Sequence, residues 1–144
     1  MLKLLVADDE RILREAVCYL IDWKSIGIEL AASCKNGREA YEEACRTKPD
    51  IILTDIKMPG LSGLDLVEKL SEPGRVLEFI LLTGYADFEY AHRALSHRVH
   101  HYLLKPCNEQ QIIEAVQQAA QSIYTRRQLQ QMEPTCAGVA RPEY

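Results

Sequence analysis

The sequence has no long apolar run and no excess of positive charge. Its apolar stretches have the length of strands, well short of the roughly 20 residues that a membrane-spanning helix needs. The start, Met-Leu-Lys followed at once by a strand-like run and acids, is not typical of a signal peptide. The 17 Lys and Arg against 21 Asp and Glu give a net charge of -4, whereas phosphate recognition needs a basic face. We therefore expect no membrane partner and no direct nucleic-acid binding by this segment.

Cysteine is present but without a pairing pattern. The count of five is odd and no two are spaced as C-x-x-C, so neither a disulfide framework nor a zinc site is indicated. Unpaired thiols suit a reducing compartment, and the expected location is therefore the cytoplasm. The positions are Cys18, Cys34, Cys45, Cys107 and Cys136.

What the chain does have is a regular alternation of apolar runs and amphipathic stretches. At 144 residues and 47% hydrophobic, it is long enough for one domain with a full core. Continuous apolar runs predict strands, and apolar residues at helical spacing predict helices between them. The predicted strands are residues 2–7, 28–33, 51–54, 76–83 and 99–104, and the predicted helix N-caps are Asn36, Ser62, Asp87 and Asn108, with the fourth helix over residues 88–97.

The last predicted helix loses its apolar stripe near Tyr124. Residues 126–131 are helix-compatible with little to bury, which favours a solvated linker helix. From about Glu133 the pattern is lost, which predicts a partly disordered tail or linker. The expected division is a domain over residues 1–125, then a helix extension and tail over 126–144.

Strands that alternate with helices predict an α/β fold with a doubly wound parallel sheet, here (βα)₅. Right-handed crossovers leave few topologies, and the commonest five-stranded one is the flavodoxin-like order 2-1-3-4-5. In that order the carboxyl ends of strands one, three, four and five lie side by side.

A polar residue follows each of these four strands. Asp55 comes after the buried run Ile51–Thr54 and before Pro59 and Gly60, which end the strand. Alone, an Asp in this position more often caps a turn than takes part in chemistry. Its neighbours on the predicted sheet edge argue for chemistry; the full set is Asp8, Asp9, Asp55, Thr83 and Lys105.

Three carboxylates that converge repel one another and must be neutralised. Hard oxygen ligands suit Mg²⁺, and Lys105 supplies a further positive charge. A carboxylate nucleophile beside a metal, a lysine and a hydroxyl is the equipment for accepting a phosphoryl group.

The chain resembles a receiver domain of a two-component response regulator over roughly residues 2–125. The motifs LLVADDE, ILTDIKMPGLSG, ILLTGYADF and YLLKP stand in the right order on the right elements. The resemblance implies that Asp55 is the phosphoacceptor and that Asp9 binds Mg²⁺ directly. It also implies that Asp8 binds the metal through water and that the backbone carbonyl of Lys57 is a further metal ligand.

The same resemblance implies a switch. Thr83 would turn toward the phosphoryl group, Lys105 would pair with it, and the aromatic Tyr102 would swing inward as Thr83 moves. A cis Lys105–Pro106 peptide is also expected from the family.

A narrower resemblance concerns the output. The segments IDWK (21–24) and GYADFEYA (84–91) are similar to receivers of regulators with an AraC-type DNA-binding domain. This implies a sensor histidine kinase as phosphodonor, an AraC-type output domain elsewhere in the parent protein, and a possible homodimer on activation. The chain ends too soon to hold that domain, so an excised receiver is expected.

Alternatives stay open. An aspartyl phosphatase commonly has a second acid two residues after its nucleophile, but Lys57 stands there. A pseudo-receiver that is never phosphorylated is disfavoured by the complete set of acids, threonine and lysine. A flavin module needs a phosphate-binding loop after strand one, where this chain has acids. The departures from the family pattern are Lys57 and Tyr85 beside the site, and His97, His100 and His101 before Tyr102. These histidines are expected on the surface rather than on a metal, because His100 and His101 alternate between faces.

Overall fold

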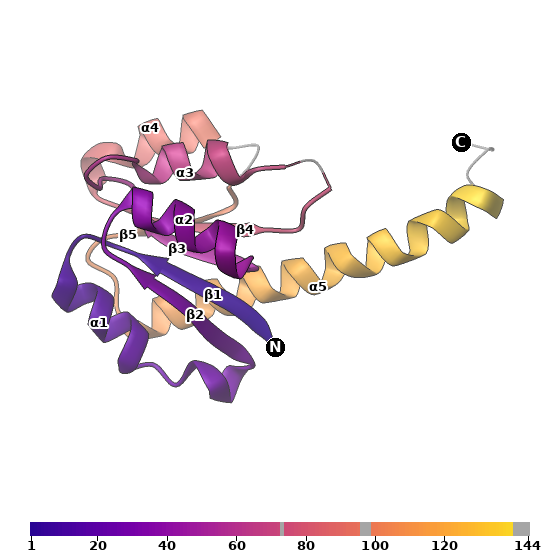
Figure 1. Cartoon of the computed structure of the whole chain (residues 1–144), viewed down its shortest axis with the longest axis horizontal. Coiled ribbons are helices and arrows are strands. Elements are labelled where there is room, and N and C mark those ends of the chain that lie inside the picture. Colours follow the sequence, from indigo (N-terminus) through magenta and orange to yellow (C-terminus); the bar gives the residue numbers. More distant parts are fainter. Residues whose placement is uncertain (73, 96–98, 140–144) are drawn as a thin grey trace.

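The computed structural model describes residues 1–72, 74–95 and 99–139. Five parallel strands form one sheet in the order β2-β1-β3-β4-β5, which confirms the predicted fold class and topology (Figure 1). The strands are β1 (Leu2–Ala7), β2 (Ile28–Cys34), β3 (Ile51–Asp55), β4 (Glu78–Thr83) and β5 (His101–Leu104).

Helices cover both faces of this sheet (Figure 1). One core is closed by α1 and α5, with Val17 and Val116 among its buried residues. The other is closed by α2, α3 and α4, with Ala44, Leu66 and Ala91 among its buried residues. Because β3 and β4 have helices on both sides, every one of their residues is buried. The helices are α1 (Arg11–Tyr19), η1 (Trp23–Ile26, a 3₁₀ turn), α2 (Gly37–Thr47), α3 (Gly63–Leu70), α4 (Tyr85–Leu95) and α5 (Glu109–Val139).

The helix starts follow the predicted caps in three cases. The Asn36 side chain accepts from the Glu39 N–H at 2.8 Å, and Ser62 forms a reciprocal capping box with Asp65. Asn108 accepts from the N–H of Gln111 at 2.8 Å. The fourth cap was predicted wrongly: α4 already begins at Tyr85, so Asp87 lies inside its first turn.

Two strands are shorter than their apolar runs. The predicted fourth strand began at residue 76, but β4 starts at Glu78, which pairs with Ile51, the first residue of β3. The predicted fifth strand began at residue 99, but β5 starts at His101, opposite Ile80 of β4. The start of β4 thus coincides with the start of its neighbour β3, and apolar composition does not report where a neighbouring strand begins.

The last helix is longer than the sequence predicts. The irregular segment expected from Glu133 is helical in the structure as far as Val139. Beyond the sheet α5 projects away from the domain (Figure 1). The domain boundary near residue 125 stays a prediction. In the described part of the chain, no helix is both long and apolar enough to cross a membrane.

Candidate functional site

Three carboxylates meet at the carboxyl edge of the sheet. Oxygens of Asp8, Asp9 and Asp55 all lie within 4.8 Å of one another. They meet because β1 and β3 are paired neighbours, with Ala7 opposite Thr54. Asp8 directly follows the last residue of β1, and Asp55 is the last residue of β3. The structure thus brings together the three acids that the sequence placed at one edge.

The three acids differ in burial. Asp8 and Asp55 are buried, whereas Asp9 is exposed. Asp8 is fixed by a hydrogen bond from the Glu10 N–H to its Oδ1, at 2.9 Å. Burial raises the pKa of Asp8 above its ordinary value, and the Glu10 N–H and the charge of Lys105 offset only part of that effect. A further positive charge at this edge would therefore be stabilising.

Lys105 gathers the carboxylates around one ammonium group. Its Nζ lies 2.8 Å from Asp55 Oδ2, 3.1 Å from Glu10 Oε1 and 3.4 Å from Asp8 Oδ2. Burial alone would lower the pKa of Lys105, but the hydrogen bond and charge of Asp55, with those of Asp8 and Glu10, raise it. The Lys105–Pro106 peptide is cis, as expected. Lys105 is therefore a permanent cation in contact with the predicted phosphoacceptor.

The Thr83 hydroxyl has a different partner. Thr83 ends β4 and is buried, and its Oγ1 donates to the carbonyl of Gly84 at 3.0 Å. Its own carbonyl accepts from the Lys105 N–H at 2.8 Å, which ties the ends of β4 and β5 together. In this structure Thr83 is thus in the predicted place, with its hydroxyl hydrogen-bonded locally.

Two contacts around Asp55 were not anticipated. Glu10 was not among the predicted site residues, yet its carboxylate binds Lys105. Gly63, the last residue of the motif ILTDIKMPGLSG, was given no role from the sequence. A Cβ at this position would lie 2.5 Å from the Asp55 carbonyl oxygen. Its N–H donates to the Ile56 carbonyl at 2.8 Å, which closes the loop after β3. The available signal in the sequence was the glycine itself, because a residue without a Cβ allows another backbone segment to approach closely.

Lys57 lies at the mouth of the site. Its side chain is exposed, and its Nζ pairs with Asp87 of α4 at 3.4 Å. The pair borders a cavity of about 510 Å³ that Asp9 and Met58 also line. The side chain of Lys57 thus points toward α4, and the role of its backbone carbonyl as a metal ligand stays a prediction.

Tyr102 is packed against α4. Its ring meets the edge of Phe88, with centroids 5.9 Å apart at 72°, and lies 5.3 Å from the ring of His92. Its hydroxyl is buried and has no hydrogen-bond partner among the described residues. Burial raises the pKa of Tyr102. The residue predicted to switch therefore holds a polar atom in an unsatisfied position.

The histidines before Tyr102 were predicted to lie on the surface, and the structure differs between them. His97 lies outside the described residues, and His100 is exposed as expected. The surface prediction was wrong for His101, whose Nε2 lies 3.1 Å from Glu78 Oε1 in a largely buried pair. Glu78 interrupts an apolar run, and a buried acid of that kind needs a partner, which was the available signal.

Known proteins with similar sequences and structures are regulators and their receiver domains. The response regulator receiver domain family matches residues 4–117. The chain therefore belongs to the response regulator receiver domain family, as its motifs indicated. Receiver domains of this kind serve two-component regulators and act as regulatory modules.

Individual relatives agree with this assignment. The chain is 48% identical over 118 residues to the uncharacterized transcriptional regulatory protein YesN of Bacillus subtilis, covering 82% of this chain and 32% of YesN. Among solved structures it resembles the REC domain of AraT, a response regulator from Geobacillus stearothermophilus (36% identity, TM-score 0.79, 88% of this chain and 98% of that one). It also resembles a two component transcriptional regulator AraC from Clostridium phytofermentans (28%, 0.81, 88% and 98%). The chain spans 32% and 44% of the first curated relatives it matches.

Proposed function

We propose that this chain is a phosphorylation-activated signalling switch that accepts a phosphoryl group on Asp55 from a sensor histidine kinase. The observation that carries the proposal is the 2.8 Å contact between Lys105 Nζ and Asp55 Oδ2 inside a cluster of three acids. In the transfer, an Asp55 carboxylate oxygen bonds to phosphorus while the bond from phosphorus to the donor nitrogen breaks. Lys105 is placed to neutralise the phosphoryl oxygens that arrive beside it.

The residues present fit Mg²⁺. Three carboxylates within 4.8 Å form a hard-oxygen donor set. The proposed ligands are Asp9 and Asp55 directly, Asp8 through water, and the backbone carbonyl of Lys57. When bound, Mg²⁺ would offset the negative charge of the phosphoryl oxygens. Asp8 would hold its place in the site through the Glu10 N–H.

The proposed switch starts from the contacts of Thr83 and Tyr102. The Thr83 hydroxyl leaves the Gly84 carbonyl to donate to a phosphoryl oxygen on Asp55. Because the Thr83 carbonyl holds the Lys105 N–H, this movement bears on the end of β5. Tyr102, whose hydroxyl has no partner among the described residues, then changes its packing against α4.

The alternatives are weaker on the geometry. An aspartyl phosphatase would have a carboxylic acid as general acid two residues after Asp55. That position holds Lys57, whose ammonium group is paired with Asp87. A pseudo-receiver has no need for Lys105 in contact with both Asp55 and Asp8. Both observations favour a regulatory phosphoacceptor that transfers and slowly loses its phosphoryl group.

For the parent protein we propose a cytoplasmic transcription regulator with an AraC-type DNA-binding domain and homodimerisation on activation. The support is the description of the relatives as transcriptional regulators and the small share of the curated relatives that this chain spans. The segments IDWK and GYADFEYA support the AraC-type assignment.

The test is intact-mass spectrometry after incubation with acetyl phosphate, with and without Mg²⁺. Wild type should gain one phosphoryl adduct that requires Mg²⁺, and Asp55→Asn should gain none. Glu29→Gln, which changes an exposed acid of β2, is the matched control and should behave as wild type. Folded wild type without an adduct, both from acetyl phosphate and from a cognate kinase, would leave the pseudo-receiver as the better account.

A further inference from the structure

The continuation of α5 beyond the core is attached to the opposite, amino edge of the sheet. Arg126 Nη1 donates to Glu78 Oε2, and Arg127 Nη2 donates to Asp50 Oδ1 at 2.6 Å. Gln130 Nε2 donates to the Gly74 carbonyl at 3.2 Å. We call residues 124–130 of α5 the arm. Residues 126–131 were expected to form a solvated linker helix, but the side chains of Arg126, Arg127 and Gln130 contact the domain.

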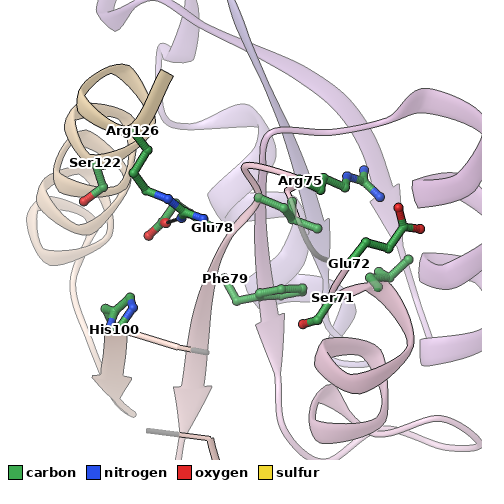
Figure 2. A pocket seen from close by; sticks show the side chains of 10 residues that line it. Ser71, Glu72, Arg75, Glu78, Phe79, His100, Ser122 and Arg126 are labelled. Atoms are coloured by element: carbon green, nitrogen blue, oxygen red, sulfur yellow. Dashed lines mark hydrogen bonds and ion pairs between the residues drawn. The ribbon is translucent and has the colours of Figure 1, made fainter. Parts of the chain in front are cut away.

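The arm is held by polar contacts, because the apolar packing of α5 ends before the first residue of the arm. The last residue of α5 in the hydrophobic core is Ile123. The two large apolar side chains of the arm, Tyr124 and Leu129, are exposed. A cavity of about 260 Å³ lies between Ser122 and Arg126 of α5 and the segment around Ser71 and Arg75 (Figure 2). Close packing therefore does not fix the arm on this side.

Glu78 is the buried member of these contacts. Its side chain is 3% exposed, and both of its oxygens are used, one by His101 and one by Arg126. Figure 2 shows the Arg126 side chain reaching from α5 to Glu78 on β4. Burial alone would raise the pKa of Glu78, but the His101 hydrogen bond and the charge of Arg126 lower it below its ordinary value. The carboxylate is thus ionised and fixed between three elements of the fold.

The three elements lead back to the candidate site. Glu78 begins β4, and Thr83 ends it. His101 begins β5 and directly precedes Tyr102. Arg126 belongs to the arm. One carboxylate therefore joins both strands that carry the proposed switch residues to the helix that leaves the domain.

We propose that Glu78 is a positioning residue that couples β4 and β5 to the arm, so that phosphorylation of Asp55 changes how firmly the arm is held. The coupling rests on the proposed function; the anchoring of the arm does not. A shift of β5 moves His101, changes its contact with Glu78, and so alters the ion pair that holds Arg126. The two exposed contacts of Arg127 and Gln130 play the smaller part, because exposed pairs contribute little.

The experiment is amide hydrogen exchange, read by mass spectrometry, on peptides that cover the arm and on peptides from residues 112–123. It compares wild type, Glu78→Gln and Arg126→Gln, each with and without acetyl phosphate and Mg²⁺. Without phosphorylation, arm amides should exchange about ten-fold faster in both variants than in wild type, with residues 112–123 unchanged. Arg126→Lys, which keeps the charge, should restore part of the protection. Arg126 is partly exposed, so the Arg126 variants keep the test decisive where Glu78→Gln fails to fold.

Phosphorylation should change the exchange of the arm in wild type and leave it unchanged in both Gln variants, although all three take the same adduct on Asp55. Wild-type exchange rates in the arms of both variants would overturn the anchor. An adduct on wild type without any change in the arm would overturn the coupling. Absence of the adduct would overturn the proposed function and the coupling with it, while the unphosphorylated comparison still decides the anchor.

Discussion

Lys105 Nζ is closer to Asp55 Oδ2, at 2.8 Å, than to Glu10 Oε1 or Asp8 Oδ2. The Lys105 ammonium is therefore already paired with the Asp55 carboxylate, which is the proposed acceptor of the phosphoryl group. An added phosphoryl group would meet its counter-charge without rearrangement of the loop after β5.

Removal of that cation should destabilise the fold. In Lys105→Met, the buried Asp8 and Asp55 lose their shared partner, and we expect the free energy of unfolding to fall by about 1–3 kcal/mol. Urea denaturation with and without Mg²⁺ measures the effect. Mg²⁺ should restore more stability to the variant than it adds to wild type, because it replaces the missing positive charge. Equal stability of variant and wild type without Mg²⁺ would contradict the electrostatic role.

The close approach at Gly63 predicts a steric effect. In Gly63→Ala the new Cβ would lie 2.5 Å from the Asp55 carbonyl oxygen, so the loop must shift, at a cost of about 1–3 kcal/mol. Gly84→Ala is the matched control, since a Cβ there meets nothing within 4 Å. Thermal unfolding should show a lowered Tm for the first variant and a near-unchanged Tm for the second. A reversed order would show that the loop after β3 tolerates the added methyl.

The unsatisfied hydroxyl of Tyr102 predicts a stabilising substitution. Because this buried oxygen has no hydrogen-bond partner among the described residues, Tyr102→Phe should raise the free energy of unfolding by about 1 kcal/mol. Tyr124→Phe, at an exposed position, should change it little. Chemical denaturation of both variants measures the difference. Destabilisation by Tyr102→Phe would mean that the hydroxyl is satisfied in solution.

Glu78 predicts a pH dependence of stability. Its pKa is lowered in the folded chain from an ordinary value of 4.5, so its ion-pair contribution is fully present above that pH. The contribution is lost as pH falls through the lower folded pKa. At pH 7, Glu78→Gln should be less stable than wild type by about 1–3 kcal/mol. The gap should narrow below pH 4.5, as measured by urea denaturation across pH. A gap that stays constant down to acid pH would contradict an ionised Glu78.

Much of the fold and the predicted site could be obtained from the sequence, because the relevant signals are local. Apolar runs gave the five strands, and the residue after each run gave Asp55 and Lys105. Parallel topology alone then placed these side chains on one edge. Strand starts were predicted less well, since Glu78 begins β4 only because Ile51 opposite begins β3.

The missed contacts are long-range. Glu10 meets Lys105 across 95 positions of sequence, and Arg126 meets Glu78 across 48. Nothing in the spacing of these residues reports such pairings. The second of them depends on how α5 lies along the sheet. An acid inside an apolar run, as at Glu78, signals that a partner exists but does not identify it.

The most direct measurement of the central claim is the location and chemistry of the phosphoryl group. Wild-type chain treated with acetyl phosphate and Mg²⁺ should be digested and mapped by mass spectrometry, with and without hydroxylamine, which cleaves acyl phosphates and spares phosphate esters. We predict a single adduct on the peptide that contains Asp55, removed by hydroxylamine. An adduct on another peptide, or one that resists hydroxylamine, would contradict Asp55 as the phosphoacceptor.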